Sequence, residues 1–230
     1  MRPARRQSLP YPSPHLRHFL LLAALIAAEF SVAYYGADWL TARRGLHIRA
    51  YLSAELAIPL VPVMVVPYMT MYAIFLFAPL VLRTTADLDR CAAALAGVIA
   101  IAGLAFLLLP AEPGFAPVST AGSIWDPWLR LAATLSRRYN LVPSLHVALF
   151  TVAAATYAPR VSGGLRVLLG AWLAIVAAST VLTHQHHLLD VASGLALGAC
   201  GARLAGTERA TARAPCATTV LSREGSGCSP

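Results

Sequence analysis

The chain has 230 residues, of which 58% are apolar and only 12% are charged. Soluble domains average about 25% charged residues, so this composition, with a mean hydropathy of +0.65, excludes an ordinary soluble domain and indicates an integral membrane protein. The net charge of +8 comes from 18 arginines, with no lysine, against ten acids. Such an excess can indicate nucleic-acid binding, but these arginines lie between apolar runs, where membrane topology and anionic headgroups explain them.

Six apolar runs predict an all-α bundle of six transmembrane helices. They cover residues 18–35, 58–82, 91–109, 144–157, 165–182 and 188–204. The predicted membrane domain is therefore 18–205, between a disordered cytoplasmic lead over 1–17 and a disordered cytoplasmic tail over 206–230. A signal peptide cut after Ala33 is the alternative for the first run, but the long Pro-rich lead and Glu29 fit it poorly.

Two segments are expected to differ from plain spans. Three prolines (Pro59, Pro62 and Pro67) crowd the start of the second run and predict a broken or interfacial helix there. The long loop over 111–142 carries two tryptophans, which belong at headgroup depth, and residues 126–136 predict an interfacial amphipathic helix. The fourth span can extend backward to Asn140 as its cap.

The distribution of arginines predicts the orientation. If the six runs alternate, twelve of the 18 arginines lie on the face of the N-terminus. The positive-inside rule places that face in the cytosol. The start of the fourth span and the junction of the fifth and sixth then share the opposite, extracytoplasmic face of a multi-pass protein of the cell membrane.

Two short stretches at that face carry side chains that could take part in catalysis: residues 143–146 (PSLH) and residues 179–190 (STVLTHQHHLLD). His186 and Asp190 are four residues apart, so on a helix they share one face. A carboxylate there can orient the imidazole and leave its other nitrogen basic, as in nucleophilic catalysis. His146 is the natural second group, a proton donor or acceptor.

These stretches resemble two signature motifs of the type 2 phosphatidic acid phosphatase superfamily, PSGH and SRxxxxxHxxxD. The matching residues are Pro143, Ser144 and His146, and Ser179, His186 and Asp190 at the correct spacing. Leu145 replaces the Gly, Thr180 replaces the Arg, and the lysine-containing first motif, KxxxxxxRP, cannot exist here. Leu145, preceded by Tyr139-Asn140, is similar to the inositol phosphorylceramide synthase (inositolphosphotransferase) branch.

The resemblance implies a metal-independent enzyme without a cofactor, acting on a lipid or isoprenoid phosphate. It implies that His186 is the nucleophile and forms a phosphohistidine, that Asp190 fixes its tautomer, and that His146 protonates the leaving oxygen. The outcome would be hydrolysis, or transfer of the phospho-headgroup to an alcohol such as inositol.

Phosphate also needs donors. Pro143 near a helix start leaves amides at Ser144, Leu145 and His146 for an anion, and the Ser144 hydroxyl adds a donor. The bulk of Leu145 predicts a narrower or differently lined pocket. Candidates to replace the missing Lys and Arg of the family pattern are Arg137, Arg138 and His184, with Arg130 weaker; we favour Arg138 and His184.

Other interpretations exist for the same residues. The histidines from His184 to His187 could form a metal-binding cluster, since imidazoles suit Zn, Cu or Ni, in a non-catalytic metal-binding protein or a membrane carrier. The absence of paired half-helices in matching positions argues against a carrier. The spacing of Tyr68, Tyr72 and Phe75 is more typical of helix packing than of a substrate groove.

Overall fold

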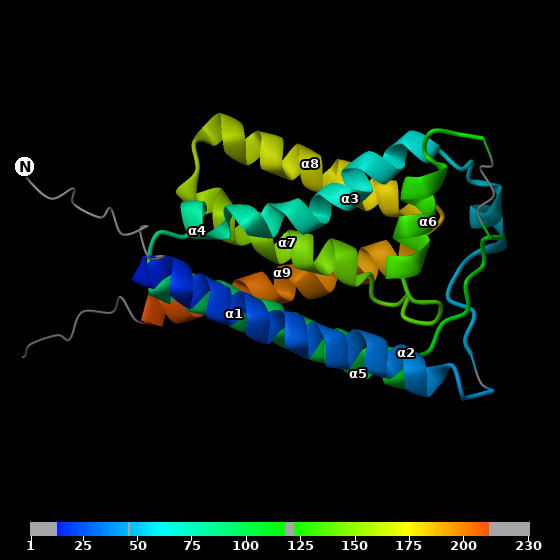
Figure 1. The fold of residues 1–230 in the computed structure, drawn as a ribbon, viewed down its shortest axis with the longest axis horizontal. Helices are drawn as coiled ribbons and strands as arrows, with labels where there is room; N and C mark the ends of the chain where they lie inside the picture. The colour runs from blue at the N-terminus through cyan, green and yellow to red at the C-terminus, as the bar shows by residue number, and fades with distance from the viewer. Residues whose placement is uncertain (1–12, 46, 118–121, 212–230) are drawn as a thin grey trace, which may run out of the picture.

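The computed structural model describes residues 13–45, 47–117 and 122–211. Within these ranges the chain is helical and carries no strand, only an isolated β-bridge between Ile48 and Ala111. The long helices run side by side between two ends of the molecule (Figure 1). The all-α class predicted from the sequence is therefore confirmed.

The helices follow the predicted runs closely. The first is continuous from α1 (Pro14–Phe30) through a π-helical turn (Ser31–Tyr35) into α2 (Gly36–Thr41). The second consists of a 3-10 turn (Pro62–Met64), α3 (Val65–Ile74), a 3-10 turn (Phe75–Phe77) and α4 (Ala78–Val81). The others are α5 (Thr85–Leu108), α6 (Asp126–Leu135), α7 (Leu145–Tyr157), α8 (Gly163–Leu182) and α9 (Leu188–Thr211).

Capping residues explain where the boundaries differ from expectation. α1 begins at Pro14, inside the lead predicted to be disordered, because the Ser13 side chain accepts a hydrogen bond from the Leu16 amide and proline suits the first helical position. α9 continues to Thr211, beyond the predicted end of the domain. The cap of α7 is Ser144 and not Asn140, whose side chain donates to the Tyr34 carbonyl instead. Residues 1–12 and 212–230 lie outside the described residues.

The prolines break the second run as expected. Ile58–Val61 is not helical, and the Val61 amide donates to the Leu182 carbonyl at the end of α8 (2.9 Å). The predicted interfacial helix is α6, which packs two small or apolar residues, Leu129 and Ala132, against α3 and leaves Trp128 exposed. These segments cover the end of the bundle that carries both motifs.

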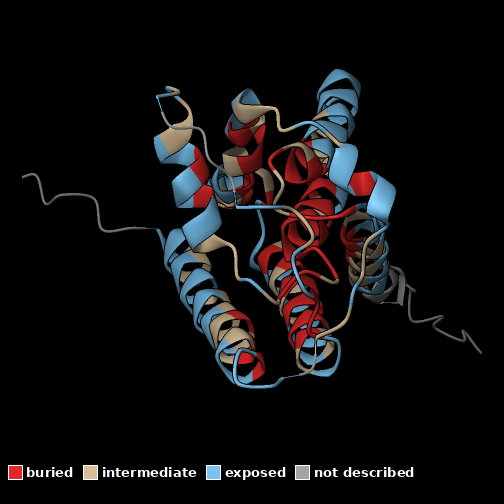
Figure 2. Ribbon diagram, turned by 90° about the vertical axis from the view of Figure 1, so that its right-hand side faces the viewer, coloured by how far each residue is buried: buried red, intermediate tan, exposed pale blue. Residues whose placement is uncertain are grey.

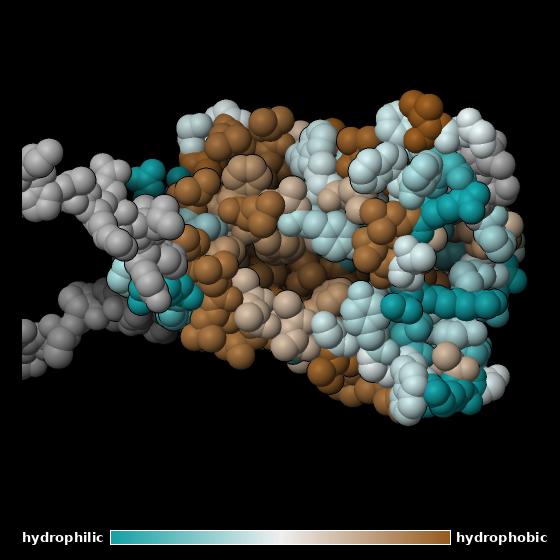
Figure 3. All heavy atoms as spheres, in the orientation of Figure 1, coloured by the Kyte–Doolittle hydropathy of each residue, from teal (hydrophilic) through white to brown (hydrophobic). Residues whose placement is uncertain are grey.

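Four helices of the described part are long and apolar enough to cross a membrane: Pro14–Thr41, Pro62–Val81, Thr85–Leu108 and Gly163–Leu182. Many large apolar side chains on them are exposed, among them Leu21, Leu25 and Val32 on the first helix. Figure 3 shows such residues over the middle of the molecule and hydrophilic residues toward its ends. A hydrocarbon environment stabilises this arrangement, which water would not.

Helix α7 is the centre of the bundle. It packs against α5, α8 and α9, and eleven of its 13 residues are buried, in keeping with the concentration of buried residues in the middle of Figure 2. A helix of this length spans about 20 Å, less than a hydrocarbon core of about 30 Å. Its surroundings are therefore protein, and its first turn lies below the loops that cover the bundle.

Glycines bring α9 into backbone contact with α7. A Cβ at Gly194 would lie 2.5 Å from the Ser144 carbonyl oxygen, and a Cβ at Gly198 would lie 2.5 Å from the Ala148 carbonyl oxygen. Small residues four apart allow such close helix approach in membrane proteins. The contact aligns the N-terminal ends of the two helices, where the Ser144 amide donates to the Asp190 carbonyl (2.8 Å).

Gly198→Ala should therefore destabilise the protein by about 1–3 kcal/mol, because the added methyl group meets backbone that cannot move independently. The measurement is the midpoint of thermal unfolding in detergent. Gly170→Ala on α8 is the matched control, since its methyl group would meet nothing within 4 Å and alanine favours the helix by about 0.5–1 kcal/mol. Equal shifts for both variants would show that the α7–α9 contact is not tight.

Candidate active site

The carboxylate of Asp190 organises the connection between α8 and α9. One oxygen, Oδ2, accepts a hydrogen bond from the His187 amide (2.8 Å) and lies 3.3 Å from Nδ1 of His186. Asp190 is in the first turn of α9, where a carboxylate satisfies an otherwise free amide and favours the helix dipole. With Nδ1 held by the acid, Nε2 of His186 is left as the basic nitrogen.

The backbone of the same connection is fixed by α8. The amides of Gln185 and His186 both donate to the Thr180 carbonyl at 3.0 Å. Thr180 is itself buried, and its hydroxyl donates to the Ala177 carbonyl. Thr180, which stands at the Arg position of the family pattern, therefore holds this connection through its carbonyl oxygen. Its side chain forms a hydrogen bond within α8.

His146 lies opposite, in the first turn of α7. Its ring stacks on Tyr68, with 4.1 Å between centroids, and Tyr72 meets it edge-on at 5.3 Å. Its Nε2 is buried and has no hydrogen-bond partner among the described residues. A buried polar atom without a partner is costly, so this nitrogen is available to a ligand.

His146 and His186 line one small pocket. The other lining residues are Phe30, Tyr34, Met71, Tyr72, Leu135, Ser136, Leu145 and Leu149. Its volume is about 20 Å³, close to what one water requires, so side chains must move for a phosphate group to enter. Leu145 is one of the walls, which agrees with the narrowing expected from Leu at the Gly position.

Three of these residues, Tyr34, Tyr72 and Ser136, bring hydroxyl groups that the sequence did not indicate as site groups. The Tyr34 hydroxyl accepts a hydrogen bond from the Arg137 amide (3.0 Å), which leaves its proton to donate. Ser136 Oγ pairs with the Tyr68 hydroxyl (2.8 Å). The expectation that Tyr68 packs in the core fits its full burial, whereas Tyr72 faces the pocket. The sequence signal that could have indicated Tyr34 was its spacing of one helical turn from Phe30.

Some of the groups predicted to donate to phosphate already have other hydrogen-bond partners. Ser144 is fully buried, and its hydroxyl accepts from the Val147 amide as the cap of α7. Its amide is bound to Asp190, so of the three amides expected for phosphate only those of Leu145 and His146 lie in the first turn without an intrahelical acceptor.

The predicted arginines do not line the pocket of the two histidines. The Arg137 guanidinium lies over the Tyr35 ring, 4.4 Å from its centroid, and its Nε is buried without a partner among the described residues. Arg138 is exposed and lies over Tyr139 at 5.6 Å. Arg130 forms an exposed ion pair with Asp126 on α6.

The histidines between positions 184 and 187 make separate contacts and do not converge on one point. His184 Nε2 lies 3.0 Å from the Ile58 carbonyl, and its ring stacks on Phe115, which stacks on His187 in turn. Tyr51 covers the other face of His187. No group of three or more His, Cys, Asp or Glu side chains that could hold a metal ion occurs in the described ranges, so the metal-cluster interpretation has no geometric support.

His187 is tied to Glu55 and to Gly114. Its Nε2 accepts a hydrogen bond from the Gly114 amide (3.1 Å), so Nδ1 carries the proton and donates to Glu55 Oε2 (3.2 Å). The same carboxylate accepts from the amides of Leu188 (2.9 Å) and Leu52 (3.0 Å). Glu55, in the 3-10 turn Ser53–Ala57, thus caps α9 from a distant part of the chain.

Burial and hydrogen bonding set the protonation of this pair. Burial alone would raise the pKa of Glu55, but the Leu188 and Leu52 amides and the His187 ring outweigh it and lower the pKa. Burial lowers the pKa of His187, and the nearby His186 ring adds to this, although Asp190 and Glu55 oppose it. His187 is therefore neutral in the fold, as the Gly114 amide at Nε2 requires.

The neutral state of His187 predicts that the stability of the fold depends on pH. Because the unfolded chain binds a proton at His187 below about pH 6.5 and the folded chain does not, stability should fall on acidification from pH 7.5 to 5.5, by at most about 1.4 kcal/mol per pH unit. Thermal unfolding in detergent across this range measures it. His187→Gln keeps one acceptor and one donor without titrating, and should flatten the profile.

His47→Gln is the control, because His47 stacks on Tyr139 outside the Glu55 network and should leave the profile unchanged. The interpretation of His187 as a neutral structural histidine is wrong if His187→Gln retains the full acid slope of the wild-type protein.

Comparison with known proteins agrees with this geometry. A search of curated proteins found no match to the chain. The family model of the PAP2 superfamily matches residues 39–204. This range contains His146, His186 and Asp190 but not Phe30 or Tyr34. Since this range covers more than half of the sequence, the chain belongs to the PAP2 superfamily.

Proposed function

We propose that this protein is a membrane-embedded phosphatase or phosphotransferase that acts on a lipid or isoprenoid phosphate through a phosphohistidine at His186. One observation carries the proposal. His186, oriented by Asp190, shares a pocket with His146, whose Nε2 is buried and has no partner in the described part of the chain. A nucleophile, its orienting acid and a second proton-transfer group are the parts that phosphoryl transfer by covalent catalysis needs.

The steps balance with these groups alone. Nε2 of His186 attacks phosphorus and forms the N–P bond while the bond from phosphorus to the lipid oxygen breaks. His146 gives its proton to that oxygen, which leaves as an alcohol. Water or an acceptor alcohol then attacks phosphorus, gives its proton to His146, and releases His186. Asp190 holds the Nδ1 proton throughout, so that the imidazole always presents Nε2.

The transferred phosphoryl group spreads charge over three oxygens, and each donor lost can cost about 3–4 kcal/mol. The groups that support its binding here are the first-turn amides of Leu145 and His146, and the hydroxyls of Tyr34, Tyr72 and Ser136. They replace the sequence-based candidates Arg138 and His184 in this proposal. The Arg137 amide contacts the Tyr34 hydroxyl, and the Arg137 Nε is buried without a partner among the described residues.

Leu145 supports headgroup transfer as a second possible reaction. At the Gly position of the motif it resembles the inositolphosphotransferase branch, and it forms a wall of the pocket. Transfer of the phospho-headgroup to an alcohol such as inositol is therefore the second outcome to test beside hydrolysis. The same assay separates the two, because transfer requires added acceptor and hydrolysis does not.

We further propose six membrane spans and two cytosolic termini. α7, a short span enclosed by the other helices, and α9 are added to the four helices that are long and apolar enough to cross a membrane. The arginine distribution supports this orientation. The N-terminus of α7 and the junction of α8 and α9, which carry His146 and His186 of the pocket, lie at the end opposite the N-terminus of α1 (Figure 1). The pocket then opens near the extracytoplasmic face of the cell membrane.

His186→Ala should lower phosphate release by at least about 10³-fold, since it removes the attacking atom, and Asp190→Asn by roughly 10²–10⁴-fold, since the wrong tautomer is favoured. The assay measures phosphate release and headgroup transfer from a panel of lipid and isoprenoid phosphates in detergent with EDTA, with and without inositol. His47→Ala is the matched histidine control. Full activity of His186→Ala, or activity lost with EDTA and restored by a divalent cation, would contradict the mechanism.

A fusion of paired reporters after residue 211, one active only in the cytosol and one only outside it, tests the orientation. The cytosolic reporter should be active, because positive loops are retained on that side. A matched fusion within the 111–125 loop should give the reverse result. Activity of the external reporter at the C-terminus would overturn the orientation and the extracytoplasmic site.

A further inference from the structure

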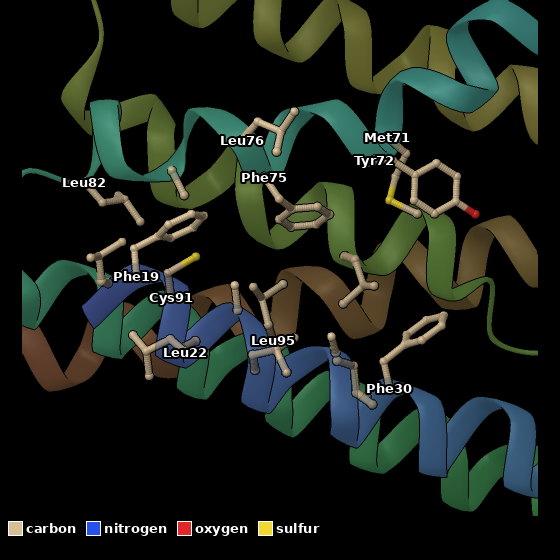
Figure 4. A pocket seen from close by; sticks show the side chains of 18 of the residues that line it. Phe19, Leu22, Phe30, Met71, Tyr72, Phe75, Leu76, Leu82, Cys91 and Leu95 are labelled. Carbon is tan, nitrogen blue, oxygen red and sulfur yellow. The ribbon is translucent and has the colours of Figure 1, made fainter. Parts of the chain in front are cut away.

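An apolar cavity of about 350 Å³ lies beside the pocket of the two histidines. Its walls come from α1, the α3–α4 segment, α5 and α7 (Figure 4). On the face shown in Figure 3, a hollow bordered by apolar residues separates the first helix from the second. The cavity therefore adjoins the hydrocarbon region on the side from which a membrane lipid can enter.

The cavity and the pocket adjoin each other and share four lining residues. Both are lined by Phe30, Met71, Tyr72 and Leu149. Tyr72 stands at the junction: its ring borders the cavity, and its hydroxyl points toward the end of the bundle that carries α6 (Figure 4). Because this ring also meets His146 edge-on at 5.3 Å, a ligand in the cavity with a polar end would pass Tyr72 to reach the histidines.

The far end of the cavity is closed to polar groups. There Leu82 and Leu88 are buried, and the Tyr157 hydroxyl already donates to the Ile74 carbonyl (3.2 Å). The remaining polar atom, the Cys91 sulfur, lies 3.7 Å from the Thr156 hydroxyl. Such walls bind hydrocarbon and would leave any sugar or peptide hydroxyl without a partner.

The dimensions fit one hydrocarbon chain. On α1 the lining runs from Phe19 to Phe30, a rise of about 16 Å along the helix, which is close to half of a hydrocarbon core about 30 Å thick. The volume is near the lower end of the roughly 300–1,000 Å³ range for small-ligand sites. A second chain of equal length would need a second cavity of the same size.

We propose that the cavity binds the single apolar chain of a monoalkyl or isoprenyl phosphate, with Tyr72 at the boundary between chain and phosphate. This inference rests on the proposed function, and it selects single-chain lipid phosphates as the substrate class. The chain length that is accepted is then set by how far the cavity extends from Phe30 toward Phe19 and Leu88.

Blocking the cavity at different depths tests this. Ala27 and Ala23 line it one turn apart on α1. Ala27→Phe, nearer the histidines, should lower kcat/KM for dodecyl phosphate and hexadecyl phosphate by about tenfold or more, the lower range for a lost apolar fit. Ala23→Phe should lower kcat/KM less for dodecyl phosphate than for hexadecyl phosphate, because more of the longer chain lies beyond Ala23 toward Phe19. Neither variant should affect butyl phosphate, whose chain does not reach the added ring.

Ala24→Phe is the matched control, because Ala24 is exposed on the same helix and does not line the cavity. It should leave the chain-length profile unchanged. The inference is overturned if Ala27→Phe lowers all three substrates equally, if it has no effect, or if a two-chain phosphatidic acid is cleaved better than dodecyl phosphate by the wild-type protein.

A binding experiment separates this inference from the proposed function. A dodecylphosphonate with a terminal diazirine cannot be hydrolysed, so it probes binding in the wild-type protein even if no substrate is cleaved. After irradiation, mass spectrometry should find the label on peptides that contain Phe19 or Leu88, and excess dodecylphosphonate should remove it. Label spread over the exposed face of α8, without competition or with equal competition by dodecanol, would show ordinary lipid contact and refute the inference.

Discussion

The backbone of α9 can lie against α7 only because Gly194 and Gly198 carry no side chain where the helices meet. This contact determines the site, because the first turns of these two helices carry Asp190 and His146. The hydrogen bond from the Ser144 amide to the Asp190 carbonyl fixes their register. A shift of one helix by even part of a turn would separate the two histidines, and catalytic geometry tolerates only small displacements.

Buried carboxylates require compensation, and here the N-terminus of α9 provides it. Asp190 accepts a hydrogen bond from the His187 amide from within the helix, and Glu55 accepts one from the Leu188 amide from a 3-10 turn more than a hundred residues earlier in the chain. Free amides at a helix start otherwise need water, which this buried connection excludes. The same two acids therefore stabilise α9 and hold the imidazoles of His186 and His187 in defined tautomers.

The sequence predicted the helical class, the places of the helices and the pairing of His186 with Asp190, because hydrophobic runs and i, i+4 spacing are local properties. It misplaced the cap of α7, since Asn140 and Ser144 are both capping residues and only the contact with Tyr34 decides between them. It favoured Arg138 and His184 as phosphate donors from their nearness in the chain. Arg138 lies over the neighbouring Tyr139 ring. The stacking of His184 on Phe115 and the entry of Tyr34 into the pocket depend on long-range contacts that no local pattern encodes.

None of the described residues that line the pocket is an arginine, and this changes how an anionic substrate can be held. Fixed cations would bind the phosphate of substrate and product as well as that of the transition state, and the part of this binding that all three share does not raise kcat. In the apolar surroundings formed by Phe30, Leu145 and Leu149, a few hydroxyl, amide and imidazole donors act at low dielectric, where each is stronger than in water. On the proposed function, a chain bound in the adjoining cavity would supply the affinity that ionic contacts supply elsewhere. The donors of the pocket would then serve the transition state, and the released phosphate, having no chain, would be held weakly.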